Sequence, residues 1–266
     1  MAVNHVQHRP LREQRVLVTR PRAQGDELAR RLEAYGAQVI FYPAIQVVPV
    51  EAESLDQALR ELASGAARVD WVVFTSANGV TFTCERLAVL GLALGVLRRA
   101  RLAAVGPATA RALTDLNLAV DFVPEKFVAE EIAAGIGDVR GQHILLLGAE
   151  ITREALAERL QQLGARVTRV AVYRTVAVQP DEVALAELAR GVDVVMLASA
   201  SAARSFARAA AEHAWPWLAR AVIACIGPVT AEAARDAGLA VQLVADEHIA
   251  IGLADALAVY FETTKR

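Results

Sequence analysis

Short apolar runs alternate with amphipathic stretches along most of the chain. The β-branched run at 16–19 predicts a strand. The next stretch repeats its apolar positions at helical spacing and stops at Gly36, a residue typical of the position after a helix, so we expect a helix over 24–35. A second strand is predicted immediately afterwards, over 38–42.

The same alternation continues downstream. Further strands are predicted over 70–74, 102–105 and 119–122, each leading into a helical stretch. Strands that are apolar throughout, and not only at every second position, are typical of a parallel sheet covered on both faces. The predicted fold class is therefore α/β and doubly wound, with about five strands in each sheet.

The chain also repeats itself. Three blocks recur in the same order: 15–43 with 143–171 at an offset of 128, 70–80 with 193–203, and 102–123 with the segment that starts at Ile223. A period above 120 residues is too long for a solenoid and indicates duplicated domains. We therefore expect two similar doubly wound parallel-sheet domains.

An extended, β-rich segment without glycine follows the second strand of each copy, at 42–50 and at 170–178. Both segments are longer and more apolar than ordinary loops. If they pair as a two-stranded β linker, the chain crosses between the domains after residue 50 and returns after residue 170.

This crossing predicts where the domains divide. The parts are a flexible arm over 1–14, a discontinuous domain from 15–41 plus 180–266, linker segments at 42–52 and 169–179, and a contiguous domain over 53–168. The alternative is two contiguous halves divided near residue 140.

Composition narrows the class of protein. Of the 266 residues, 55% are hydrophobic and 22% are charged, which is enough apolar material for two cores and too little charge for a disordered chain. The net charge of −2 argues against a general nucleic-acid binder, because phosphate backbones require a basic surface.

Targeting and metal signals are missing from the sequence. No apolar window is long enough for a membrane span, and the polar N-terminus does not resemble a secretory signal. The two cysteines form no CxxC pair and no metal-binding spacing with histidine. We expect a cytoplasmic monomer without a metal or cofactor and without nucleic-acid or membrane partners.

Candidate ligand-binding residues follow the strands. In a doubly wound sheet, ligands bind where the carboxyl ends of strands lead into helix N-termini, and these N-termini attract anions. Hydroxyl, amide and glycine residues at those positions are Thr75, Ser76, Asn78, Gly79, Gly106, Thr109, Ser199, Ser201, Gly227 and Thr230. The alternative for Ser76 and Ser199 is that they only cap helices.

Arg20 and Arg153 follow the first strand of each copy. Their guanidinium groups suit carboxylate recognition, although exposed arginines are also common without any such role. Tyr173 lies in the second extended segment, where it either packs or reaches a ligand. Neither a phosphate loop nor a Ser/His/Asp grouping is present, so nucleotide binding and catalysis by a strong nucleophile are not supported.

Six short motifs, taken in order, resemble those of the uroporphyrinogen-III synthase family, also called HemD-like. They are VLVTRP (16–21), VVFTSANGV (72–80), VGPATA (105–110), LGAExxRExL (147–156), VYRT (172–175) and IGPVTA (226–231). The resemblance extends from residue 15 to about residue 260. It implies two α/β domains joined by a two-stranded linker, and no cofactor.

The resemblance also implies a reaction. Linear hydroxymethylbilane, which carries several carboxylates, loses water in the inter-domain cleft and closes to uroporphyrinogen III with its last pyrrole ring inverted. Tyr173 matches the tyrosine of the family motif and is expected to donate a proton to the leaving hydroxyl or only to orient it. The serine, threonine, asparagine, glycine and arginine candidates named above are expected to bind substrate carboxylates. The alternative is a cytosolic two-domain binding or regulatory protein with the architecture of periplasmic binding proteins.

Overall fold

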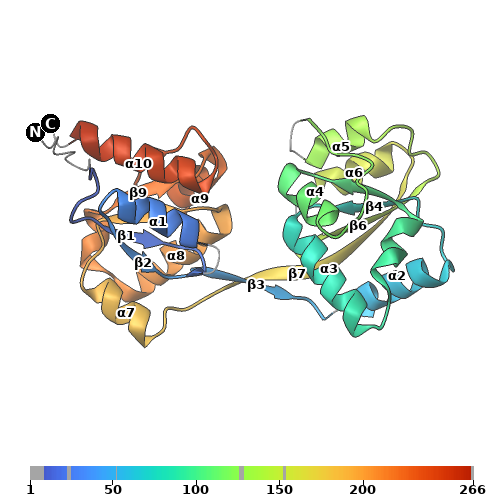
Figure 1. Cartoon of the computed structure of the whole chain (residues 1–266), viewed down its shortest axis with the longest axis horizontal. Coiled ribbons are helices and arrows are strands. Elements are labelled where there is room, and N and C mark those ends of the chain that lie inside the picture. Colours follow the sequence, from blue (N-terminus) through green and yellow to red (C-terminus); the bar gives the residue numbers. More distant parts are fainter. Residues whose placement is uncertain (1–8, 23–24, 52, 126–128, 152–153, 265–266) are drawn as a thin grey trace, which may run out of the picture. The chain divides into compact units, whose positions relative to one another are not determined.

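The computed structural model describes residues 9–22, 25–51, 53–125, 129–151 and 154–264, in two compact units. Unit 1 comprises residues 1–46 and 176–266, and unit 2 comprises residues 47–175. Each unit holds a sheet with helices on both faces, as Figure 1 shows. The predicted α/β class with parallel sheets is confirmed.

The sheet of unit 1 is parallel and has the order β10-β9-β8-β1-β2. Its strands are β1 (Arg15–Val18), β2 (Gln38–Phe41), β8 (Val194–Leu197), β9 (Val222–Cys225) and β10 (Val241–Val244). The helices of the unit are α1 (Asp26–Ala34), α7 (Glu182–Ala189), α8 (Ala200–His213), η3 (Pro216–Ala219), α9 (Pro228–Asp236) and α10 (Ala250–Thr264).

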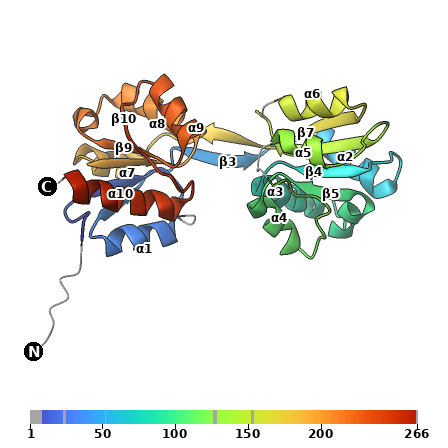
Figure 2. The same ribbon diagram turned by 90° about the horizontal axis from the view of Figure 1, so that it is seen from above.

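Successive residues of these strands enter two different cores. Leu17 packs with residues of α7, α8 and α9, whereas its neighbours Val16 and Val18 pack with residues of α1 and α10. Figure 2 shows α1 and α10 side by side on their face of the sheet. Because side chains alternate across a strand and both faces are covered, the inner strands β1, β8 and β9 are apolar at every position except Arg15.

Unit 2 has the sheet order β3-β7-β6-β4-β5. The strands are β3 (Ile45–Pro49), β4 (Trp71–Phe74), β5 (Arg101–Ala104), β6 (His143–Ala149) and β7 (Arg166–Ala177). The helices are α2 (Glu53–Ser64), α3 (Ala77–Val89), η2 (Leu94–Arg99), α4 (Pro107–Thr114), α5 (Ala129–Gly135) and α6 (Ala155–Gln162). β4, β5, β6 and β7 pair in parallel.

The core of unit 2 is divided in the same way. Val72 and Phe74 pack with residues of α2, α3 and α4, and Trp71 and Val73 pack with residues of α5 and α6. β3 lies next to β7, and the N–H of Val50 donates to the carbonyl of Val172 at 3.1 Å. The role of these segments as a two-stranded linker stays a prediction.

The repeat in the sequence corresponds to a repeat in the sheets. β5, β4, β6 and β7 occupy the same successive positions in unit 2 as β9, β8, β1 and β2 in unit 1. One detail recurs at the amino ends of the strands: the carboxylate of Asp70 accepts the His143 N–H at 2.9 Å, and that of Asp193 accepts the Arg15 N–H at 2.8 Å. Each aspartate thereby ties two neighbouring strands together.

Two expectations from the sequence need correction. The strand predicted over 119–122 is reduced to an isolated bridge between Ala103 and Phe122. The carboxylate of Asp121 takes the N–H of Leu102 at 2.7 Å, and Pro124 has no N–H with which to extend a ladder.

The arm predicted over 1–14 is too long. Leu11 is fully buried against the α1 and α10 side of unit 1, and its N–H donates to the carbonyl of Tyr35 at 3.0 Å. Residues 1–8 lie outside the described residues. The stretch from residue 9 to residue 14 therefore contributes to the fold because it brings an aliphatic side chain into the core.

Candidate functional site

Four helices begin directly after the carboxyl ends of strands and carry no acidic residue in their first turns. They are α3 and α4 in unit 2, and α8 and α9 in unit 1. By contrast, α1 has Asp26 and Glu27 in its first turn. Because the N-terminal end of a helix carries a partial positive charge, these four ends are left uncompensated and favour an anionic ligand.

Serine side chains cap two of these helices. The Gly79 N–H donates to Ser76 Oγ at 3.1 Å, and the Ala202 N–H donates to Ser199 Oγ at 3.1 Å. The capping role foreseen as the alternative for both serines is therefore real. Asn78 and Ser201 lie in the first turns after the caps and make no side-chain hydrogen bond with other described residues.

The other two helices begin at a glycine followed by proline. Gly106 and Gly227 are the N-cap residues of α4 and α9, in extended conformation. Thr109 and Thr230, in the first turns, are each only 5% exposed. Neither hydroxyl has a hydrogen-bond partner in the part of the chain that the structure describes. These two threonines are therefore free to bind a ligand that enters at the helix N-terminus.

Tyr173 lies beside the N-terminus of α3. Its phenol oxygen is 2.9 Å from Ser76 Oγ, and its ring packs against Phe82 with 6.0 Å between centroids. A bulge in β7 accompanies this placement, because Gly148 pairs with Ala171 while the next residue, Ala149, pairs with Tyr173. Tyr173 is thus both a packed residue, 8% exposed, and a polar one.

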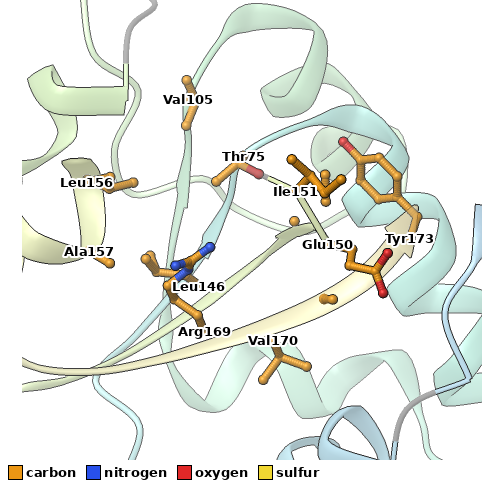
Figure 3. Close-up of a pocket in the computed structure, with 13 residues that line it drawn as sticks. Thr75, Val105, Leu146, Glu150, Ile151, Leu156, Ala157, Arg169, Val170 and Tyr173 are labelled. Carbon is orange, nitrogen blue, oxygen red and sulfur yellow. The ribbon is translucent and has the colours of Figure 1, made fainter. Parts of the chain in front are cut away.

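A cavity of about 520 Å³ adjoins Tyr173 in unit 2. Figure 3 shows its apolar walls, which include Val105, Leu146 and Leu156. Its polar groups come from Thr75, Glu150, Arg169 and Tyr173. A cavity with apolar walls and a few polar groups is typical of a small-molecule site.

Gly148 allows the strand ends to approach closely at this cavity. A Cβ atom at this position would collide with Thr75 Oγ1. Thr75 follows β4, and its N–H donates to the carbonyl of Leu147 at 3.2 Å. Glycine is therefore required for Thr75 to lie against the end of β6.

The prediction from sequence missed Glu150 and Arg169. Glu150 lies within the motif at 147–156, but only Arg153 was selected there. Arg169 was placed in the linker, whereas the structure pairs it with Leu146 in the sheet and joins it to Glu154 by a 2.9 Å ion pair. Arg153 itself lies outside the described residues.

Arg20 follows β1 at the carboxyl edge of the unit 1 sheet. The preceding residue, Thr19, is buried and its hydroxyl donates to the carbonyl of Met196 at 2.7 Å, which anchors this strand end. Burial lowers the pKa of the Arg20 guanidinium. Arg20 has no hydrogen bond or ion pair with any other described residue. A carboxylate ligand would supply an ion-pair partner for its guanidinium.

Among the described residues, no group of three histidine, cysteine, aspartate or glutamate side chains is arranged to hold a metal ion. No helix in the described part of the chain is both long enough and apolar enough to cross a membrane.

Comparison with known proteins identifies the family. A model of the family described as uroporphyrinogen-III synthase HemD matches residues 26–255. A uroporphyrinogen-III synthase of Synechococcus elongatus is 30% identical over 92% of this chain and 94% of its own length. A porphyrin biosynthesis protein HemD of Ruminiclostridium josui is 31% identical over 63% of this chain. That protein is longer, and the match covers only 33% of its length.

A solved structure shares the fold. A mutant uroporphyrinogen III synthase from the extremely thermophilic bacterium Thermus thermophilus superposes with a TM-score of 0.65 at 23% identity, covering 95% of this chain and 99% of its own. The family model matches most of the sequence, including both halves of the repeat. This match agrees with the family motifs found in each half. The chain belongs to the uroporphyrinogen-III synthase family.

Proposed function

We propose that this protein is a uroporphyrinogen-III synthase, a cyclising lyase that converts hydroxymethylbilane to uroporphyrinogen III with loss of water and inversion of the last pyrrole ring. The observation that carries the proposal is the hydrogen-bonded pair of Tyr173 and Ser76 at the uncompensated N-terminus of α3. A proton-donating phenol there lies next to an end that attracts carboxylates.

Substrate binding is assigned to the carboxyl ends of both sheets. The substrate carries several acetate and propionate groups, and the four helix N-termini without acidic residues suit such a ligand. The groups that we assign to its carboxylates are those of Arg20, Thr75, Ser76, Asn78, Gly79, Gly106, Thr109, Arg153, Ser199, Ser201, Gly227 and Thr230. Among the described residues, the Arg20 guanidinium and the hydroxyls of Thr109 and Thr230 have no hydrogen-bond partner, which supports this assignment.

The first chemical step is loss of the substrate hydroxyl. Ser76 Oγ already accepts the Gly79 N–H, so its own hydrogen can point to the Tyr173 oxygen. In that orientation the phenol hydrogen is free to be donated to the leaving hydroxyl, which departs as water. Tyr173 then acts as the general acid, with Ser76 stabilising the charge that develops on the phenol oxygen.

The remaining steps depend on positioning. Departure of the hydroxyl leaves an electrophilic azafulvene, which the substituted carbon of the last ring attacks to form a spiro intermediate. That intermediate fragments and closes again in the inverted sense, and the proton released from the ring carbon that forms the final bond restores the Tyr173 phenol. Holding the carboxylates of several rings at once selects this route over direct closure, because it limits which carbon can reach the electrophile.

The experiment uses hydroxymethylbilane generated enzymatically in the assay. Separation of the products by chromatography should show the type III isomer with the protein present and the type I isomer without it. Type I product alone in the presence of the folded protein would refute the assignment. We also propose that the protein is a cytoplasmic monomer that needs no cofactor. Size-exclusion chromatography of the same preparation tests its oligomeric state.

The alternative function is a two-domain binding or regulatory protein of periplasmic-binding-protein-like architecture. It is not favoured, because the family model and the relatives named above are those of synthases. Such a protein would bind the tetrapyrrole without changing the isomer that forms, so the same assay separates the two functions.

A further inference from the structure

The cavity of unit 2 has a cationic end and an anionic end. Figure 3 shows Glu150 beside Tyr173, while Arg169 extends beside Leu146. The cavity is otherwise lined mainly by aliphatic side chains, among them Val105 and Leu156. A ligand with a flat apolar body and a carboxylate at one side would fit this distribution of charge in one orientation only.

The existing partner of Arg169 is easily exchanged. Its ion pair with Glu154 has an N–O distance of 2.9 Å, but the Glu154 side chain is 69% exposed, against 35% for Arg169. An exposed ion pair adds little stability because water competes for both groups. A carboxylate inside the cavity would meet the same guanidinium next to apolar walls, where the attraction is screened less.

The internal repeat shows that this cation is not a requirement of the fold. At the offset of 128, Phe41 is the counterpart of Arg169, and Arg20 is the counterpart of Gly148. In unit 1 the Phe41 ring lies 5.7 Å from the guanidinium carbon of Arg22. The same strand position is therefore aromatic in one unit and cationic in the other. In unit 2, Gly148 lines the cavity and lets Thr75 lie against the end of β6.

We infer that Arg169 is a specificity-determining residue that exchanges Glu154 for a carboxylate of one substrate pyrrole ring seated in this cavity. The inference rests on the proposed function, since it names the ring and carboxylate site of that same reaction. The volume of about 520 Å³ lies within the usual range for a small-molecule site. Among the described residues that line the cavity, Arg169 carries the one positive charge, so the acidic side chain of the ring is directed to it.

The test compares steady-state kinetics with hydroxymethylbilane for four variants. Arg169→Gln removes the cation, Arg169→Lys retains the charge without the planar fork, and Glu154→Gln removes the competing carboxylate. The matched control is Arg166→Gln, which removes an exposed arginine from the same strand, three residues away and outside the lining of the cavity. Thermal unfolding of each variant shows that it is folded.

The expected pattern is a change in KM without a comparable change in kcat. Arg169→Gln should raise KM by on the order of tenfold, as expected for loss of one charge-assisted pair. Arg169→Lys should recover part of that loss, and Glu154→Gln should lower KM because the guanidinium is no longer occupied. Arg166→Gln should behave as the wild type.

An unchanged KM for Arg169→Gln overturns the inference, as does an equal rise in KM for Arg166→Gln. A rise in KM for Glu154→Gln also overturns it, because the glutamate would then support binding and not compete with it. If the wild-type protein forms only the type I isomer, the proposed function fails as well. That outcome is recognised in the wild-type control before any variant is compared.

Discussion

The phenol of Tyr173 and the hydroxyl of Ser76 are 2.9 Å apart although 97 residues separate them in the chain. Ser76 also accepts the Gly79 N–H, so one side chain both caps α3 and contacts the proposed acid. The cap of α3 fixes the position of the serine, and packing of its ring against Phe82 fixes the position of the tyrosine. The pair is therefore oriented before substrate binds.

Tyr173→Phe should lower kcat by roughly 100-fold or more, because it removes the general acid and retains the ring packing. The measurement is the rate of type III product formation, with circular dichroism to show that the variant is folded. A kcat close to that of the wild type would contradict a role for the phenol in the chemical step.

Ser76→Ala should lower both stability and kcat, whereas Ser199→Ala should lower stability to a similar degree and raise KM without lowering kcat, because Ser199 is assigned only to substrate binding. Each substitution removes one N-cap hydrogen bond, at a cost of about 1 kcal/mol in the free energy of unfolding. Only Ser76 also contacts a tyrosine hydroxyl. Urea denaturation and kcat for both variants separate the two effects. An equal loss of kcat in both would argue against a special function of the Tyr173 contact.

Gly148→Ala should destabilise unit 2 by about 1–3 kcal/mol, since its new methyl group would collide with the Thr75 hydroxyl and overpack the strand end. Urea denaturation measures the change. The matched control is Gly95→Ala, because no atom lies within 4 Å of a Cβ built at Gly95. Combining Gly148→Ala with Thr75→Ala should recover part of the lost stability, and no recovery would indicate that another contact is responsible.

Asp255→Asn should weaken the packing of α10 on α1, most clearly at neutral pH. The carboxylate accepts hydrogen bonds from Arg31 at 2.8 Å and from the Tyr35 hydroxyl at 2.8 Å. The Arg31 hydrogen bond is the main cause that lowers the pKa of Asp255. A lowered pKa in the folded state means that stability is present above the unfolded pKa and is lost as pH falls through the folded one.

The free energy of unfolding as a function of pH tests this prediction. The wild type should lose stability in acid more steeply than Asp255→Asn, and the difference at pH 7 should be no more than about 1 kcal/mol because the side chain is 42% exposed. Asp115→Asn replaces an exposed carboxylate in unit 2 and serves as the control. Parallel acid profiles for the wild type and Asp255→Asn would contradict the proposed role.

Tyr42→Phe should remove part of the alkaline sensitivity of unit 1. The Tyr42 hydroxyl donates to the Val178 carbonyl at 2.8 Å, and burial raises the pKa of Tyr42 to about 12. The neutral phenol therefore stabilises the fold below the unfolded pKa of about 10, and this contribution is lost as pH rises towards 12.

Denaturation between pH 8 and 12 gives the comparison. Tyr42→Phe should cost about 1 kcal/mol at neutral pH, through loss of one buried hydrogen bond, and should reduce the alkaline decline. Tyr260→Phe, at a partly exposed position of α10, is the control and should leave that decline unchanged. An alkaline profile of Tyr42→Phe that matches the wild type would show that another group causes the decline.

Local pattern and internal similarity determined much of the architecture. The predicted strand 16–19, helix 24–35 and strand 38–42 correspond to β1, α1 and β2 within two residues at each end. These predictions succeed because a strand buried on both faces, and a helix closed by glycine, need particular residues wherever they lie. The duplication likewise follows from sequence alone, since both copies must satisfy the same packing.

Only the tertiary structure determined which side chains meet. The 2.9 Å contact of Tyr173 with Ser76 depends on the parallel order of β7, β6 and β4 and on a bulge in β7. The sequence predicts Arg169 in the linker, whereas its pairing with Leu146 places it in the wall of the cavity. The strand expected at 119–122 is reduced to a single bridge beside Pro124, which has no N–H with which to extend a ladder. Periodicity reports which faces are apolar, whereas contacts between distant segments depend on sheet order and register, which no local pattern encodes.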